Sequence, residues 1–202
     1  LTDFITYKKV YVPTVHYVDS EETAREYTPA KYAIDGSKST FWGTRWSSGN
    51  DVLPHDIQID LGVSKKITGF TYLPRQNNVN GRIANYEIYV SDNPNNWGTA
   101  VATGTWPNTT DLQTVTFAEK RGRYYRLVAL SEVNGNKWSA AAEINVISTE
   151  VLNVKDNTKL RLSIFPMPFQ DSLTINIDRN DFVNSKKINV NIFNMNGAEV
   201  FK

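Results

Sequence analysis

Short runs of alternating apolar and polar residues, separated by Asn, Asp, Gly and Pro, fill most of the first 150 residues. Helical periodicity is almost absent, so the pattern predicts an all-β fold. We expect strands at residues 15–19, 56–61, 67–74, 85–91, 100–106, 113–117, 124–131 and 142–148. Their spacing and the turn residues between them are typical of a β-sandwich. Residues 20–26 are predicted to form a short helical turn with Ser20 as its N-cap.

The pattern changes after residue 148. Residues 150–161 are polar and contain no aromatic side chain, which indicates a linker between a domain at 1–149 and a unit at 162–202. The second unit is predicted to contain a strand, a turn marked by Pro166 and Pro168, another strand, and a hairpin around Asn196-Gly197. Because about 45 residues form a poor core, we expect a small, incomplete β-sandwich-like unit.

Composition limits the classes of function. The net charge of +1 gives no electrostatic sign of nucleic-acid binding, and no apolar run is long enough to span a membrane. The absence of cysteine excludes disulfides and thiolate chemistry. The only histidines are His16 and His55, and no spacing suggests a catalytic set, so we expect no enzyme activity from this chain. The chain lacks an initiator Met and is expected to be cut from a longer protein, with any catalytic domain upstream.

The stretch 32–46 (YAIDGSKSTFWGTRW) combines a carboxylate, turn-forming residues and large aromatic rings. Asp, Gly, Ser and Thr favour a tight turn, whereas Phe and Trp favour burial. A polar turn held by buried rings can bring carbonyl and carboxylate oxygens together. These residues leave three interpretations open, namely a cation site, a binding edge, or a rigid loop without a ligand.

Ordered motifs along 15–147 resemble the coagulation factor V/VIII type C (discoidin) family, and within it the family 32 carbohydrate-binding modules. The motifs are AIDGSKSTFWGTRW (33–46), LPHDIQIDLG (53–62), ITGFTYLPRQ (67–76), NGRIANYEIYVS (80–91), GRYYRLVALSEVNG (122–135) and SAAAEINV (139–146). The resemblance implies a jelly-roll β-sandwich that binds a glycan without catalysis.

The tail carries a second resemblance. SIFPMPFQDSLTINI and INVNIFNMNGAEV are similar to the C-terminal sorting domain of Bacteroidetes type IX secretion cargo, and they cover about its first half. This resemblance implies type IX secretion machinery as a partner and a secreted or cell-surface location.

The discoidin resemblance also implies a structural calcium ion, Ca2+, that joins the two ends of the domain. Hard cations prefer six to eight oxygen ligands, many of them carbonyls of an irregular turn. The ligands implied by the motifs are the carbonyl of Tyr32, the carboxylate of Asp35, the carbonyl of Ser37, the carbonyl and hydroxyl of Thr40, the carbonyl of Ala142 and the carboxylate of Glu143. The alternative is that Asp35 caps its own turn and Glu143 pairs with an Arg.

The same resemblance implies a sugar site in loops at one end of the sandwich. Its candidates are Trp138 for stacking, Arg75 and Glu26 for hydroxyl groups, and Trp46, Asn80 and Arg82 as further contacts. Their alternatives are core packing for the Trp residues, a surface salt bridge for Arg75 and a solvated charge for Glu26. Galactose- and GlcNAc-binding relatives usually carry His where this chain has Gly43. We therefore expect either a carbohydrate-binding module that tethers a glycan-active protein, or an adhesion or protein-interaction domain without a working sugar site. A hydrolase fragment is disfavoured.

Overall fold

The structure is a computed structural model that describes residues 11–49 and 51–148, together with short strands within residues 162–201. The chain divides into two compact units, Leu1–Glu150 and Val151–Lys202. The predicted linker at 150–161, Pro166, Pro168 and Asn196-Gly197 lie outside the described residues.

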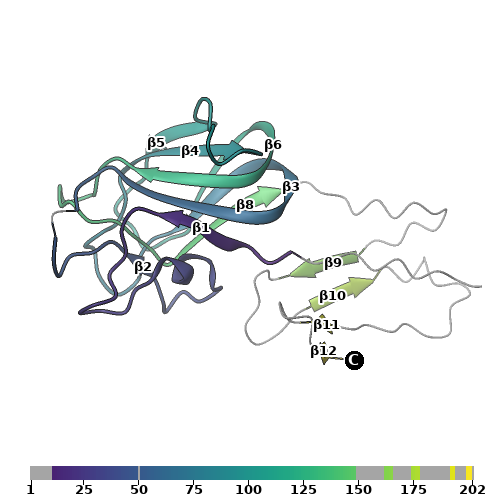
Figure 1. The fold of residues 1–202 in the computed structure, drawn as a ribbon, viewed down its shortest axis with the longest axis horizontal. Helices are drawn as coiled ribbons and strands as arrows, with labels where there is room; N and C mark the ends of the chain where they lie inside the picture. The colour runs from purple at the N-terminus through teal and green to yellow at the C-terminus, as the bar shows by residue number, and fades with distance from the viewer. Residues whose placement is uncertain are drawn as a thin grey trace, which may run out of the picture. The chain divides into compact units, whose positions relative to one another are not determined.

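Strands dominate the first unit (Figure 1). They are β1 (Thr14–Val18), β2 (Trp42–Gly43), β3 (His55–Leu73), β4 (Asn85–Ser91), β5 (Ala102–Thr105), β6 (Gln113–Ala129), β7 (Ala140–Ala141) and β8 (Glu143–Ser148). The 3-10 helix η1 (Ala30–Ile34) has Pro29, in an extended conformation, as its N-cap residue. In the part of the chain that the structure describes, no helix has the length and apolar content of a membrane span.

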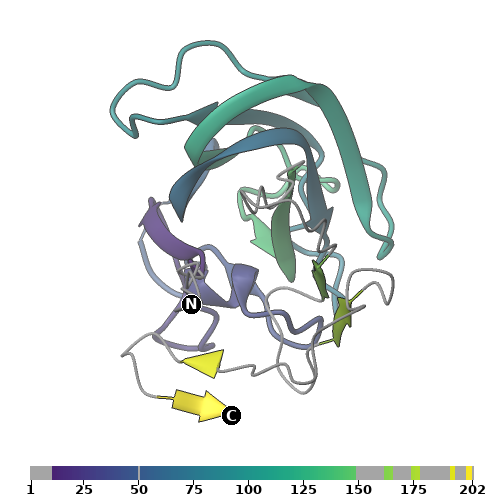
Figure 2. The same cartoon turned by 90° about the vertical axis from the view of Figure 1, so that its right-hand side faces the viewer.

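The two long strands β3 and β6 form the frame of the sandwich. They pair antiparallel along most of their length, with register shifts between residues 60 and 65 and between 67 and 69 of β3. Both strands are strongly curved (Figure 2). The first half of β3 pairs with β1, its second half pairs with β8, and β6 continues to β4 and β5. The result is a jelly-roll β-sandwich, as the sequence predicts. The predicted strands 56–61 and 67–74 are one strand, and so are 113–117 and 124–131, because bulges let a strand bend without ending.

The core lies between these layers and contains the alternating apolar residues of β3. Ile57 and Ile59 from its first half are fully buried, as is Tyr72 from its second half. Trp106 stacks on Tyr72 and Tyr86, with ring centroids 4.4 Å and 3.7 Å away. The Tyr72 hydroxyl donates a hydrogen bond to the Ala140 carbonyl at 3.0 Å. The Tyr72 ring is thus buried while its hydroxyl keeps a hydrogen-bond partner.

The segment 20–26 corrects one expectation, because it forms a bend rather than the predicted helical turn. The Ser20 hydroxyl does not cap a helix but accepts a hydrogen bond from the Arg45 N–H at 2.9 Å. The buried carboxylate of Glu22 accepts the N–H groups of Ala24 and Arg25, at 2.8 and 3.0 Å. A side chain that binds its own neighbouring backbone competes with helix formation.

The second unit contains two antiparallel strand pairs. β9 (Leu162–Phe165) pairs with β10 (Thr174–Ile177), and β11 (Ile192–Phe193) pairs with β12 (Glu199–Phe201). The first pair matches the two strands predicted on either side of the Pro-rich turn. The second pair flanks residues 196–197, as a hairpin there requires.

Candidate functional site

A pocket of about 250 Å³ opens among four segments of the first unit. These segments follow β1, surround β2, follow β3 and precede β7. The lining contains five of the six predicted sugar-binding residues, namely Glu26, Trp46, Arg75, Asn80 and Trp138, together with Thr28, Phe41, Gly43, Thr44, Asn78, Gly81, Ser139 and Ala140. Residues far apart in the sequence are therefore brought to one concave surface.

The Arg75 guanidinium is fixed before any ligand arrives. Its central carbon lies 4.0 Å from the centre of the Phe41 ring, and its Nε donates to Asn77 Oδ1 at 2.6 Å. Its Nη2 is 3.5 Å from the Glu26 carboxylate, at the outer limit of a hydrogen bond. Burial lowers the pKa of Arg75, and the Glu26 charge partly opposes that shift. The pair therefore presents a held cation and a carboxylate for which the described residues supply only this one long hydrogen bond.

Two indole rings contribute apolar surface. Trp46 is 50% exposed, whereas Trp138 is half-buried. The Nε1 of Trp138 is buried and has no hydrogen-bond partner among the described residues. The peptide groups next to Trp138 are fixed through Ser139, whose N–H donates to Thr44 Oγ1 and whose carbonyl accepts the Thr44 N–H, both at 2.9 Å. This two-bond link joins the β2 and β7 segments directly beside the pocket.

Glu22 locks two pocket-forming loops together. Besides the Ala24 and Arg25 amides, its carboxylate accepts the N–H groups of Trp46 and Ser47, at 3.1 and 2.9 Å. Burial alone raises the pKa of Glu22, but these backbone bonds outweigh it and lower the pKa to about 2. Glu22 is therefore an anion that needs no cation, and it fixes the segments that carry Glu26 and Trp46.

Glu132 plays a similar part on the other side of the pocket. Its buried carboxylate accepts the N–H of Gly81 at 3.1 Å and those of Asn134 and Asn136 at 2.7 and 2.9 Å. Gly81 has φ +87°, and a Cβ there would lie 2.9 Å from the Cβ of Ala140. Glycine is thus required at this position, where two pocket segments come into close contact.

The remaining predicted sugar contacts differ in position. Asn80 is exposed at the pocket rim. Arg82 does not line the pocket; its Nη1 donates to Asn108 Oδ1 at 2.9 Å and its Nε to the Arg75 carbonyl at 3.4 Å. Gly43 lies in the pocket lining, and a Cβ there would be 3.0 Å from Thr28 Oγ1. A direct sugar contact by Arg82 remains a prediction, while its observed contacts support Arg75.

The residues predicted to bind calcium converge at another place. Asp35 accepts the Ser37 N–H at 2.9 Å and the Thr40 hydroxyl at 2.7 Å, and that hydroxyl is also 3.1 Å from the Ser37 carbonyl. Glu143 accepts the Gly36 N–H at 2.7 Å. Burial, and then the hydrogen bond with the Asp35 carboxyl, raises the pKa of Glu143 to about 7. Two carboxyl groups thus share a partly buried space.

The other two predicted ligands lie on adjoining elements. Tyr32 belongs to η1, and Ala142 lies between β7 and β8, with η1 packed against β8. Among the described residues, no group of three or more His, Asp or Glu side chains could hold a metal ion. A cation here would therefore depend on carbonyl and hydroxyl oxygens as well as the two carboxylates, which is a donor set that suits a hard cation.

Several residues of the site were not identified from the sequence. Phe41 supports Arg75, and Glu22 and Glu132 fix the loops. The FW pair after a polar turn was a usable signal for Phe41. Nothing in the sequence separates Glu22 from the less buried acidic residues near it, because its donors come from two separate loops.

The chain belongs to the F5/8 type C domain family, which matches residues 17–144. Residues 163–202 match the secretion system C-terminal sorting domain. Both resemblances drawn from the sequence motifs are thereby confirmed.

Among curated proteins, a sialidase of Micromonospora viridifaciens is 47% identical over 130 residues, covering 64% of this chain. The chain spans only 20% of the sialidase, so most of that protein has no counterpart here. Among solved structures, CpGH89CBM32-5 from Clostridium perfringens, in complex with GalNAc-β-1,3-galactose, has 36% identity and a TM-score of 0.62, with 67% of this chain and 95% of that chain covered. The family 32 module of C. perfringens NanJ, in complex with galactose, has 34% identity and a TM-score of 0.58, with 66% and 92% covered.

Proposed function

We propose that the first unit is a non-catalytic carbohydrate-binding module, and that the pocket lined by Trp138, Arg75 and Glu26 binds one sugar residue of a glycan. The observation that carries the proposal is the convergence of these three side chains in one pocket of about 250 Å³. The similarity to family 32 modules solved with sugars supports it.

The chemistry of the pocket suits a pyranose ring. An aromatic face covers the C–H patch of a sugar, and planar charged groups bind its hydroxyls in pairs. Trp138 supplies the face, while Arg75 donates to ring hydroxyls and Glu26 accepts from them. Because Phe41 and Asn77 already hold the guanidinium, little conformational entropy is lost when the sugar binds.

Affinity for a single sugar is expected to be weak. A monosaccharide has about 12 non-hydrogen atoms, and about 0.3 kcal/mol per atom gives about 4 kcal/mol, or a Kd near 1 mM. Such a site works by tethering, because linked sites raise the effective concentration of their target. The module would hold a glycan-active parent protein close to its glycan.

The sugar is proposed to be of galactose or GlcNAc type. The pocket should discriminate less strictly between sugars than the pockets of relatives that carry His at the position of Gly43. Gly43 presents only backbone to the pocket. One hydroxyl contact is therefore absent, and the space can accommodate another substituent.

A glycan array with the wild-type chain and Trp138→Ala tests the proposal. We expect a wild-type signal that Trp138→Ala abolishes, because the stacking face is lost. Trp97→Ala is the matched control, since Trp97 lies outside the pocket and contacts Arg126. Absence of wild-type signal across host and plant glycans, or equal binding by Trp138→Ala, would exclude the sugar site.

The Asp35–Glu143 site is proposed to hold a structural Ca2+. Two carboxylates in contact repel each other unless a proton or a cation lies between them. Burial first, and then the hydrogen bond with the Asp35 carboxyl and its charge, raises the pKa of Glu143 and so favours a proton or a cation there. A calcium ion would take the two carboxylates together with the hydroxyl and carbonyls of residues 32–40 and the carbonyl of Ala142. It would join the loop at 35–40 to β8, the last strand of the first unit.

The second unit is proposed to direct the protein through the type IX secretion machinery of a Bacteroidetes-type bacterium to the outside or the cell surface. The sorting-domain match at 163–202 supports this role. A fusion of residues 151–202 to a reporter, expressed in a type IX-competent host, tests whether this segment suffices for secretion.

A second candidate function is adhesion or protein interaction by a discoidin domain whose sugar site has lapsed. Gly43 is the observation that favours it, because the pocket lacks a side chain at that point. Retention of a protein partner by Trp138→Ala, combined with a silent glycan array, would favour this candidate.

A further inference from the structure

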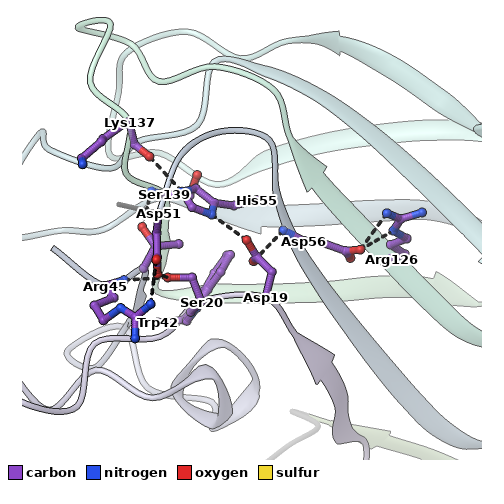
Figure 3. Close-up of polar contacts among 11 residues, drawn as sticks. Asp19, Ser20, Trp42, Arg45, Asp51, His55, Asp56, Arg126, Lys137 and Ser139 are labelled. Carbon is purple, nitrogen blue, oxygen red and sulfur yellow. Dashed lines mark hydrogen bonds and ion pairs between the residues drawn. The ribbon is translucent and has the colours of Figure 1, made fainter. Parts of the chain in front are cut away.

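His55 is a buried histidine whose two ring nitrogens both face hydrogen-bond acceptors (Figure 3). Its Nδ1 is 2.8 Å from the Asp19 carboxylate, and its Nε2 is 2.8 Å from the Lys137 carbonyl. Neutral imidazole has one N–H, so it can satisfy only one of these acceptors. Both contacts together require the imidazolium form, which donates from both nitrogens.

The Lys137 carbonyl belongs to the peptide group that precedes Trp138. His55 opens β3, so this contact joins the rigid sheet to the segment that carries the pocket ring, across 82 positions of sequence. On the far side of Trp138, Thr44 holds Ser139. The ring is thus fixed through the peptide groups on both of its sides.

We propose that His55 is a positioning residue for sugar binding, because its imidazolium form holds the peptide group before Trp138 and its neutral form releases it. The inference rests on the proposed sugar site. On loss of one proton the remaining N–H stays on Nδ1, because the Asp19 carboxylate is the stronger acceptor. The Nε2 lone pair then faces the Lys137 carbonyl, and the two repel.

The charged groups around His55 favour its protonated form. Asp19 is in direct contact, and Asp51 lies nearby in the segment before β3. Asp51 is paired with Arg45, and Asp19 also accepts the Asp56 N–H at 2.9 Å. The Asp56 carboxylate is in turn paired with Arg126, so neither Arg is bonded to Asp19 in this network.

The direction of the pH effect follows from these neighbours. Burial alone lowers the pKa of His55, but the hydrogen bonds to Asp19 and Lys137 and the charges of Asp19 and Asp51 outweigh it and raise the pKa above the usual value of 6.5. The extra stabilisation is fully present below pH 6.5 and is lost as pH rises through the raised value. Trp138 should therefore be held most firmly at pH values below the raised pKa of His55.

The test uses the whole chain, labelled with 5-fluorotryptophan and 15N-histidine, at saturating calcium so that Glu143 does not titrate. The chain has five Trp and two His, and Trp138→Phe and His16→Gln assign the resonances. We expect the His55 and Trp138 signals to share one midpoint above pH 6.5, while Trp97 and Trp106 stay unchanged. Above that midpoint, affinity for the best glycan of an array should fall about fivefold, the effect of one hydrogen bond.

Two variants separate positioning from general stability. Asp19→Asn keeps an acceptor for the Asp56 N–H but removes the negative charge. The midpoints of the His55 and Trp138 signals should therefore move together to lower pH. Asp92→Asn, away from His55, is the control and should leave both midpoints unchanged. His55→Gln should remove the pH dependence of glycan affinity. A His55 titration without a Trp138 response, or a His55 that is neutral at pH 6, overturns the inference. If no glycan binds at any pH, the proposed function fails, but the shared midpoint still decides the role of His55.

Discussion

Glu22 and Glu143 are buried carboxylates of one domain with opposite surroundings. Glu22 accepts hydrogen bonds from backbone amides of two loops, and its pKa falls to about 2. Glu143 receives the Gly36 amide but also faces the Asp35 carboxyl, and its pKa rises to about 7. Backbone N–H groups therefore stabilise the charged form of Glu22, whereas burial and the neighbouring Asp35 carboxyl disfavour the charged form of Glu143. This contrast supports a structural role for Glu22 and a cation site at Glu143.

The two sites also serve different parts of the molecule. Glu22 joins the segments that carry Glu26 and Trp46, so it stabilises the proposed sugar pocket directly. The Asp35–Glu143 site joins the polar turn at 35–40 to β8, outside the residues that line the pocket. The proposed sugar pocket should therefore depend on Glu22 both with and without calcium, and on calcium only through the stability of the domain.

Replacement of Glu22 should have the largest effect. In Glu22→Gln the amide oxygen can accept some of the N–H groups, but the NH2 group then faces the others. We expect a loss of about 3 kcal/mol in the free energy of unfolding, measured by urea denaturation at pH 7. Glu119→Gln, which alters an exposed pair with Lys66, is the control and should change it by less than about 0.5 kcal/mol.

The stability lost on replacing Glu22 should itself depend on pH. Because the folded pKa of Glu22 lies below its unfolded value of 4.5, its stabilisation is present above pH 4.5 and is lost as pH falls toward 2. The difference between wild type and Glu22→Gln should shrink over that acidic range. A difference that is equal at pH 7 and pH 3 would show that the charge of Glu22 contributes nothing.

Calcium should have the next largest effect. An ion at 100 times its Kd adds about 2.7 kcal/mol, or about 5–10 °C in Tm for a domain of this size. We therefore expect EDTA to lower the Tm by that amount and added calcium to restore it, as measured by scanning calorimetry. A Tm that moves with neither treatment would exclude the proposed ion.

Glu143→Gln is the matched test for the calcium site. Without calcium, the raised pKa of Glu143 means that wild-type stability falls as pH rises from 4.5 through about 7. The variant cannot ionise at this position, so it should lack this fall and also lack a response to calcium. A calcium response retained in Glu143→Gln would place the ion elsewhere.

The smallest effect is expected at Gly43. A His there adds a donor to the pocket, and its Cβ would displace Thr28 by only a few tenths of an ångström. One added hydrogen bond of about 1 kcal/mol would tighten galactose binding about fivefold, measured by calorimetric titration. Gly43→Ala adds the same crowding without the imidazole. Equal affinities for the two variants would show that residue 43 does not contact the sugar.

The sequence predicted the strands well where one face is buried. Ile57, Ile59 and Tyr72 alternate with polar residues, and each is buried as that alternation implies. It failed at residues 62–66, where Gly, Ser and Lys resemble a loop although β3 continues through them. A strand that bends by bulges keeps its backbone pairing while its side-chain pattern changes.

For the site, the motifs identified the side chains that face the pocket but not those that hold them. Trp138, Arg75 and Glu26 were predicted from family motifs and lie together. His55 gave no such signal, because its acceptors at Asp19 and Lys137 are distant in the sequence. Burial and long-range hydrogen bonding depend on the folded structure, so a local pattern carries little information about them.

The central claim is that a sugar binds in the pocket beside Trp138. A two-dimensional 1H–15N titration with the best glycan of an array tests it most directly, through the side-chain N–H signals of Trp138, Trp46 and Arg75. We expect these signals to shift together and saturate, while those of Trp97 and Trp106 stay in place. Saturating shifts confined to residues outside the pocket, with Trp138 and Arg75 unchanged, would contradict it.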